Sequence, residues 1–423
     1  MTSAFIVVDV TARGYRRQTY GVQIRRVALV IVAAALVLAG CSSPRTAPPT
    51  TTSPAPATTT TTTTTAPASA APAGTAVPSG FEPASVTFVS PSTGFVIGID
   101  SSCAAGSCVA LARTTDAGSS WVELPAPDAG YGARGAQGSS GVPAVSEVRF
   151  ADERDGWIFG PSLFATHDGG ASWQQIDLGG SVVSLETSGG YVDALVSPCT
   201  DGTCTGPLEL YQAATTGGGF APVLTGPSVT SSPTTEWAIS LHAPVGFVNM
   251  GDDATGAVYA TENLADPSGW KPFPDPCAAA GSHFLFVSFV APDTTSLYTL
   301  CGGEAGAGSA MKSVVETAGG VSHVVGSPPQ GGDPSALAVS GSGTLVVAAN
   351  SAASWLYRST DGGTSWTTAE TYGDGGIGFG DVGFTTSTQG VAIHGLPGPP
   401  IDYPSQLLMT TDGGASWSVV PIG

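Results

Sequence analysis

The chain has 423 residues, of which 13 are basic and 32 acidic, so its formal net charge is −19 at neutral pH. Only seven of the basic residues but 31 of the acidic ones follow residue 80, which gives segment 81–423 a net charge near −24. Such a surface repels phosphate backbones and excludes a nucleic-acid-binding protein. The segment is long enough to bury a large core, and a chain of this length can form one domain.

The N-terminal segment is typical of an exported protein. Arg25 and Arg26 precede an uncharged apolar run, Val27–Ala39, which is shorter than the roughly 18 residues that a membrane-spanning helix needs. The run ends in Leu-Ala-Gly-Cys41, which resembles the lipobox of bacterial lipoproteins. We therefore predict a signal peptide over 1–40, lipidation of Cys41 and a location on the outer side of the cytoplasmic membrane. The alternative is an ordinary signal peptide with a cysteine nearby by chance.

A stalk follows the predicted anchor. Residues 42–80 are almost entirely Thr, Ala, Pro and Ser, with an unbroken threonine run from Thr58 to Thr65. This composition provides too little apolar surface to offset the entropy of ordering. We predict a disordered linker over 41–80 that holds a domain, 81–423, away from the membrane.

A repeated motif organises the domain. Four segments share the pattern Ser/Thr-x-Asp-Gly/Ala-Gly-x-Ser/Thr-Trp and are called the box segments below: 114–121, 166–173, 359–366 and 410–417. Degenerate copies occur at 215–220, 261–270 and 316–323. The seven copies recur about every 49 residues, the period of a propeller blade.

A second pattern runs in step with the motif. Each unit contains two short apolar runs joined by a turn, as in Val86–Val89 with Gly94–Gly98. A third run leads into the box segment, and a fourth begins at its tryptophan. No stretch has sustained helical periodicity. We predict an all-β fold: a seven-bladed β-propeller of four-stranded blades with little helix.

The box residues look catalytic but recur in blade after blade, which indicates a structural role. The Asp can accept hydrogen bonds from its own turn, the second Gly suits a positive φ, and the Trp can pack its apolar face within or between blades. The predicted structural residues are Asp116, Gly118, Trp121, Asp168, Gly170, Trp173, Asp361, Gly363, Trp366, Asp412, Gly414 and Trp417.

The box segments resemble the BNR/Asp-box superfamily, which includes sialidases. The combination of paired strands and boxes is more specifically similar to the photosystem II assembly and stability factor family. This resemblance implies a seven-bladed propeller and a protein-binding scaffold role. It is weakest in the three middle units, where box residues are lost, so no particular partner is implied.

A surface glycosidase is the alternative function. The superfamily's sialidases hold the substrate carboxylate with three arginines. The domain has five: Arg113, Arg134, Arg149, Arg154 and Arg358. Arg149 is the best candidate, because two of the others directly precede box segments and two lie in turns or loops. The five histidines show no metal-ligand spacing, so we predict no metal and no cofactor.

Six cysteines follow Cys41, an even number that indicates disulfides in an exported protein. Cys103–Cys108, Cys199–Cys204 and Cys277–Cys301 are the natural pairs, and all fall on the propeller face opposite the boxes. Two loops expected on that face supply candidate contact residues, which are Asp128, Tyr131, Arg134, Asp402 and Tyr403.

The sequence thus favours a monomeric, non-catalytic binding or assembly-scaffold propeller, anchored to the membrane by lipid. Its expected ligand is another protein or a glycan.

Overall fold

The computed structural model describes residues 6–8, 72–101, 108–132, 143–200, 203–204, 206–229, 237–251, 257–398 and 404–423. Cys41, most of the predicted signal peptide and most of the predicted linker lie outside these residues. Only one helical element occurs among the described residues, a single 3₁₀ turn named η2 (Pro276–Ala279). No helix in this part of the chain is long and apolar enough to cross a bilayer.

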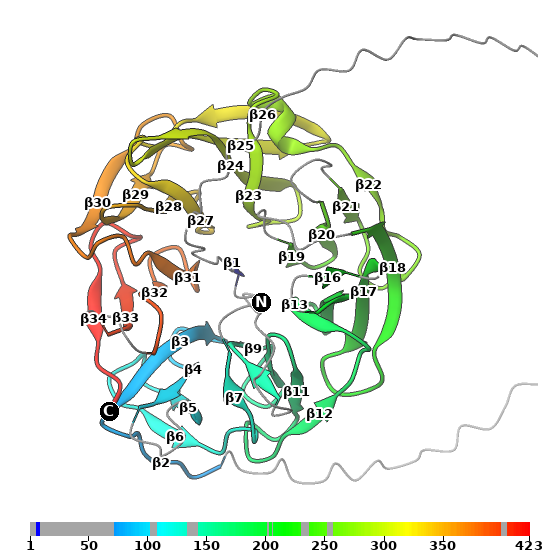
Figure 1. Cartoon of the computed structure of the whole chain (residues 1–423), viewed down its shortest axis with the longest axis vertical. Helices are drawn as coiled ribbons and strands as arrows, with labels where there is room; N and C mark the ends of the chain where they lie inside the picture. Colours follow the sequence, from blue (N-terminus) through cyan, green and yellow to red (C-terminus); the bar gives the residue numbers. More distant parts are fainter. Residues whose placement is uncertain are drawn as a thin grey trace, which may run out of the picture. The chain divides into compact units, whose positions relative to one another are not determined.

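Four-stranded antiparallel sheets, arranged in a ring, make up the described domain (Figure 1). We number these blades in chain order and give their strands from the inside outward. Blade one contains β3 (Phe81–Phe88), β4 (Gly94–Asp100), β5 (Cys108–Thr114) and β6 (Val122–Leu124). Blade two contains β9 (Glu147–Phe150), β10 (Gly156–Phe159), β11 (Leu163–Thr166) and β12 (Gln174–Ile176). Blade three contains β13 (Ser181–Ser188), β14 (Tyr191–Ser197), β17 (Pro207–Ala214) and β18 (Ala221–Ser228).

The remaining blades follow the same order. Blade four contains β19 (Ala238–His242), β20 (Val245–Asn249), β21 (Val258–Thr261) and β22 (Lys271–Phe273). Blade five contains β23 (Leu285–Val290), β24 (Ser296–Gly306), β25 (Ser309–Ala318) and β26 (Val321–Gly326). Blade six contains β27 (Asp333–Val339), β28 (Leu345–Asn350), β29 (Ser354–Ser359) and β30 (Thr367–Tyr372). Blade seven contains β31 (Phe379–Phe384), β32 (Gly390–His394), β33 (Gln406–Thr410) and β34 (Ser418–Val420). The predicted all-β propeller with four-stranded blades is confirmed.

The core lies between neighbouring blades. Blade one packs Phe95, Ile97 and Leu111 against Val148 and Phe150 of blade two, and all five are buried. The rings of Phe95 and Phe150 stack with centroids 3.7 Å apart. Similar clusters join the other neighbours around the ring. Because each face of a blade is covered by the next blade, its strands are apolar on both faces, as the short continuous apolar runs indicated.

Small strands add to the blades. β7 (Gly130–Tyr131) and β8 (Ala144–Val145) pair beside blade one, and β15 (Cys199–Thr200) and β16 (Thr203–Cys204) form a hairpin within blade three. β1 (Ile6–Val8) pairs antiparallel with the inner strand β31 of blade seven, inside the ring in Figure 1. The sequence did not predict this pairing, because residues 6–8 precede the apolar run of the expected signal peptide.

The propeller begins before residue 81. β2 (Thr75–Ala76) pairs antiparallel with the outer strand β6, and the Arg113 guanidinium donates a hydrogen bond to the carbonyl of Pro72. Val77 packs against a cluster of blades seven and one. Residues 72–80, expected to belong to the linker, therefore lie along blade one, because the edge of β6 offers unpaired backbone groups that an extended segment can satisfy.

Candidate functional site

The box segments form self-contained turns. In the second box, Thr166 Oγ1 donates to Asp168 Oδ1 at 2.8 Å, while Ser172 donates from its backbone N–H at 2.9 Å and from its hydroxyl at 2.6 Å. The boxes of Asp116, Asp361 and Asp412 repeat these contacts. The second glycine of all four boxes has a φ between +78° and +95°. Each Asp therefore holds the turn between its own strands three and four.

Hydrogen bonds explain how these carboxylates titrate. Partial burial raises the pKa of Asp168, but the bonds from Ser172 and Thr166 outweigh it and hold the pKa below its ordinary value. Bonds from Ser416 lower the pKa of Asp412 to about 2. A carboxylate held ionised by its own turn is a poor general acid at neutral pH.

The tryptophans of the first two boxes pack on phenylalanines of their own blades. Trp121 meets Phe88 edge to face with centroids 6.4 Å apart, and Trp173 meets Phe150 in the same way at 6.3 Å. The fourth strands begin one residue after each box tryptophan, at Val122, Gln174, Thr367 and Ser418.

Replacing Asp168 with Ala tests the structural role of the boxes. The variant loses three hydrogen bonds within one turn, so we expect the free energy of unfolding to fall by about 1–2 kcal/mol. Urea unfolding followed by tryptophan fluorescence measures this free energy. An unchanged stability would contradict the assigned role.

The described arginines do not converge on one point. Arg113 donates to Pro72, Arg154 to the carbonyl of His167 at 3.2 Å, and Arg358 to the carbonyl of Gly413 in the next box at 2.7 Å. Arg149 lies in the inner strand β9 and pairs with Glu186 of blade three. Arg134 lies outside the described residues. Of the four arginines that the structure describes, one lies in an inner strand of the ring and three lie toward the box face.

A buried charge cluster surrounds Arg149. Its Nη2 lies 3.0 Å from Glu186 Oε1, its Nε donates to the carbonyl of Leu185, and both paired side chains are nearly inaccessible. Glu147, two residues earlier on β9, and Asp381 of blade seven act on the same guanidinium, and both are buried. Burial raises the pKa of Glu186 above its ordinary value; Arg149 opposes this shift, and the two other carboxylates add to it.

Tyr131, one of the predicted contact residues, lies near this cluster. Burial raises the pKa of its phenol, and the charges of Glu147 and Asp381 raise it further. Asp128 is exposed in the same loop. Arg134, Asp402 and Tyr403 lie outside the described residues, so their contact roles stay predictions.

Asp193, in the middle of β14, is another buried carboxyl group. It is inaccessible, and neither of its oxygens has a hydrogen-bond partner among the described residues. Burial raises the pKa of Asp193 to about 7, and the side chain of Gln212 on the neighbouring strand opposes this shift only in part. Its protonated form is therefore the one that the fold prefers.

Replacing Asp193 with Asn should change the pH dependence of stability. The folded pKa, about 7, exceeds the unfolded value of 3.8, so the contribution of Asp193 to the free energy of unfolding falls as pH rises between about 4 and 7. The variant lacks this titration and should be the more stable protein above pH 7, by about 1–3 kcal/mol. Urea unfolding at pH 4.5, 6 and 8 checks this, and parallel curves for the two proteins would contradict it.

Two predicted disulfides are present. Cys199–Cys204 closes the β15–β16 hairpin, with Cα atoms 3.9 Å apart, and Cys277–Cys301 joins η2 to β24 with Cα atoms 5.7 Å apart. Cys103 lies outside the described residues, so its pairing with Cys108 stays a prediction. The Cys199–Cys204 hairpin forms the connection between strands two and three of blade three, and Cys277 lies in the link between blades four and five. Cys301, which was expected in a turn, lies instead inside strand β24. Because neighbouring strands are antiparallel, these connections lie on the face opposite the boxes.

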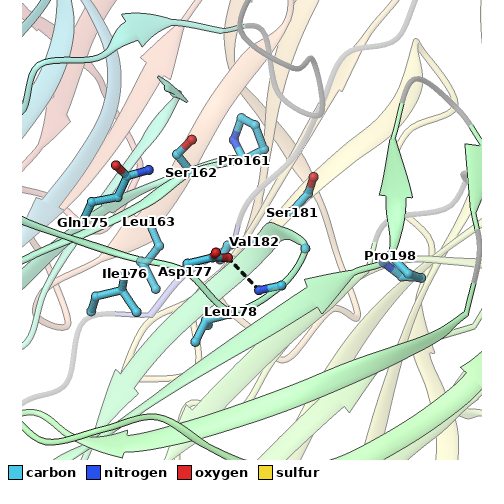
Figure 2. A pocket seen from close by; sticks show the side chains of 12 residues that line it. Pro161, Ser162, Leu163, Gln175, Ile176, Asp177, Leu178, Ser181, Val182 and Pro198 are labelled. Carbon is cyan, nitrogen blue, oxygen red and sulfur yellow. Dashed lines mark hydrogen bonds between the residues drawn. The ribbon is translucent and has the colours of Figure 1, made fainter. Parts of the chain in front are cut away.

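A groove on this disulfide face separates blades two and three. Its volume is about 660 Å³. One wall is Pro161, Ser162 and Leu163 with the end of β12; the other begins at Ser181 and includes Pro198, beside the Cys199–Cys204 hairpin (Figure 2). The link between the blades crosses it, and there Asp177 accepts a hydrogen bond from the Gly179 N–H at 2.9 Å, drawn as a dashed line. The sequence did not predict this groove, because no repeat or motif marks residues 177–181.

The inner-strand contacts between blades were missed as well, although the sequence carried a signal for them. Ser85, Ser184 and Ser240 occupy similar positions in the first strands of their blades, and each accepts a hydrogen bond from a backbone N–H of the next blade. A polar residue that recurs inside an otherwise apolar strand indicates such a partner.

No protein-family model matches the sequence, and no curated protein does. Solved structures do resemble it. YCF48 bound to a D1 peptide is 15% identical, covers 80% of this chain and 99% of its own, and superposes with a TM-score of 0.51. YCF48 from Cyanidioschyzon merolae is 14% identical, covers 80% and 98%, and has a TM-score of 0.52.

A prolyl endopeptidase also matches. It is 13% identical and has a TM-score of 0.53, and the match covers 81% of this chain but 51% of the peptidase. At such identities the likeness concerns the fold alone. The comparisons therefore place the chain among β-propellers, with YCF48 and a prolyl endopeptidase as structural neighbours.

Proposed function

We propose that this protein is a non-catalytic binding or assembly-scaffold propeller outside the cytoplasm, monomeric and anchored to the membrane through lipid on Cys41. Its working surface is the disulfide face, and its ligand is a segment of another protein. The proposal depends on one observation, which is that the two faces of the propeller differ in how accessible their polar groups and surfaces are to a ligand. On the box face the acidic side chains are engaged in their own turns. On the opposite face a groove lies open beside a covalently closed hairpin.

Three further points favour a protein ligand over other classes. The net charge near −24 of segment 81–423 disfavours anionic ligands. One structural neighbour, YCF48, was solved with a D1 peptide bound, and propellers of this kind therefore include peptide binders. Loops pinned by disulfides lose less entropy on binding than free loops do.

A glycosidase is the second candidate, because three carboxylates act on one buried arginine. Glu147, Glu186 and Asp381 surround Arg149, with Tyr131 beside two of them. Glycoside hydrolysis requires two carboxyl groups that flank a sugar. These side chains are buried between blades, which favours a structural role for the cluster over a catalytic one.

One experiment compares the two candidates. The tagged full-length chain, in detergent, is mixed with solubilised membranes of the source organism, and co-purifying proteins are cross-linked and identified. The same preparation is assayed with chromogenic glycosides, including a sialoside. A single partner that cross-links to the disulfide face supports the scaffold. Hydrolysis that is lost in Glu186→Gln would overturn it.

A further inference from the structure

The groove between blades two and three has firmly held walls. The Val182 N–H donates to the carbonyl of Pro161 across the two blades at 2.9 Å, and the Ser162 N–H donates to the carbonyl of Ala144 at 3.0 Å. On the other side, Ser181 Oγ donates to the carbonyl of Cys199 at 3.5 Å, within the hairpin that the disulfide closes. The groove is therefore formed before any ligand arrives.

An unpaired strand edge leads into this groove. β12 is the outermost strand of blade two, and among the described residues its outer edge pairs with no other strand. Its last residues, Gln175 and Ile176, line the groove. A segment that pairs with β12 and continues beyond Ile176 therefore enters the groove beside Asp177.

The chain itself shows that such an edge accepts an extended segment. β6 holds in blade one the position that β12 holds in blade two, and β2 pairs with it through Thr75↔Glu123 and Ala76↔Val122. Two paired residues thus suffice there to extend a blade outward. Main-chain pairing of this kind supplies affinity, and nearby side chains supply specificity.

Charge specifies the class of segment. Asp177 is the one charged side chain that lines the groove. It is exposed; one of its oxygens accepts from Gly179, and the other has no hydrogen-bond partner among the described residues. A carboxylate with a free oxygen, in a strongly acidic domain, favours a cationic side chain over a neutral or acidic one.

We propose that the groove between blades two and three binds an extended polypeptide segment that pairs with β12 and places a Lys or Arg side chain against Asp177. This inference rests on the proposed function and names the kind of partner and where it docks. The proposed occupant of the groove is a segment of a different protein, rather than a glycan or a second copy of this chain.

The test uses three fluorescein-labelled octapeptides of alternating Val and Thr that differ at one central position, which is Lys, Ala or Glu. Binding to the full-length chain in detergent is measured by fluorescence anisotropy at 50 mM and 500 mM NaCl. We expect the Lys peptide to bind about fivefold more tightly than the Ala peptide at low salt. This preference should shrink below about twofold at high salt, and the Glu peptide should bind most weakly.

Three variants complete the test. Asp177→Asn should abolish the preference for Lys. Asp266→Asn is the matched control: Asp266 is also exposed and caps a turn, through Ser268, but in the box-face turn of blade four, so the preference should survive. Ser162→Tyr fills the groove and should weaken all three peptides at least tenfold, while the thermal unfolding midpoint stays unchanged.

Three outcomes would overturn the groove assignment. The Lys peptide fails to bind, it binds Asp177→Asn as tightly as wild type, or a labelled oligosaccharide competes for the Ser162→Tyr-sensitive site. A membrane partner that still cross-links to the disulfide face in any of these cases would leave the scaffold function standing and remove only the groove as its site.

Discussion

Arg149→Met should destabilise the protein by about 3–5 kcal/mol at pH 8, the largest single effect that we expect. The substitution keeps much of the side-chain volume but leaves the Glu186 carboxyl buried without its partner at 3.0 Å. Breaking a buried ion pair from one side costs this much because the remaining charge stays desolvated. Glu147 and Asp381 add further negative charge to the same place. Urea unfolding followed by circular dichroism gives the free energy.

The pH dependence gives this prediction a distinctive signature. Without Arg149, burial and the neighbouring carboxylates hold the folded pKa of Glu186 still further above its unfolded value. A raised carboxyl pKa stabilises the fold at low pH, and this contribution is lost as pH rises through the folded pKa. Because the wild-type pKa of Glu186 is already raised to about 8, the two proteins differ in this contribution only above that pH, and the variant should be closer to wild type at pH 6 than at pH 9.5.

Two controls isolate the buried charge. Arg154→Met removes an exposed guanidinium that donates to the carbonyl of His167, and should cost no more than about 0.5 kcal/mol. The double variant Arg149→Met, Glu186→Gln should recover at least half of the loss, since no charge is stranded. A single variant that stays within 1 kcal/mol of wild type at pH 8 would refute the cluster's role.

Asp381→Ala should cost about 3–4 kcal/mol, because Asp381 joins the last blade to the first. Its Oδ2 accepts from Ser85 Oγ at 2.6 Å and from the Val86 N–H at 2.7 Å. Ser85 Oγ in turn accepts from the Val148 N–H of blade two at 3.2 Å. Hydrogen bonds to an ionised acceptor contribute about 1.5–3 kcal/mol each, and both donors are buried. Chemical unfolding measures the loss.

A matched variant shows whether a contact that closes the ring contributes more to stability than a contact between two other blades. Ser184→Ala removes a similar contact between blades three and four, where Ser184 Oγ accepts one N–H from Ile239 at 3.3 Å, and should cost about 1 kcal/mol. Hydrogen exchange should also increase in blades one and seven in Asp381→Ala, but not in Ser184→Ala. Equal losses for the two variants would mean that Asp381 has no distinct role in closure.

Local patterns in the sequence were sufficient to predict the strands of each blade, because a blade forms from segments that are neighbours in the chain. Each antiparallel hairpin joins neighbouring segments, so the alternation of apolar runs and glycine turns located strands such as β3 and β4. Turn chemistry was equally readable: Asp412 and its glycines hold the turn that their spacing predicted. The pairing of Cys199 with Cys204 followed from five residues of separation.

The degenerate box copies show where this local argument weakens. Asn263 keeps part of a box turn, since it accepts from the Ala265 N–H and donates its own N–H to Thr261 Oγ1. Glu316 and His323 instead face each other in a tight hairpin of β25 and β26. Without the Asp, the chain adopts the shorter turn that Gly319 and Gly320 allow, both at positive φ.

The candidate site was less predictable, because its residues are far apart along the chain. Arg149 was singled out from the sequence, but nothing in its neighbourhood identified Glu186 or Asp381 as its companions. The groove combines residues 161–163 of one turn, a link at 177–181 and Pro198. Loops of this kind have no period, so their conformations depend on the blades that they join.

The strand order within each blade, the box turns and two of the cysteine pairs could be predicted from the sequence alone, because these depend on contacts between residues close in the chain. Three features depend on the folded ring: the set of charges in the buried cluster around Arg149, the groove beside Asp177, and the pairing of β2 with β6, whereas no strand of the described residues pairs with the outer edge of β12. These features arise when the ring closes and brings separate blades into register, a global constraint that no local pattern encodes.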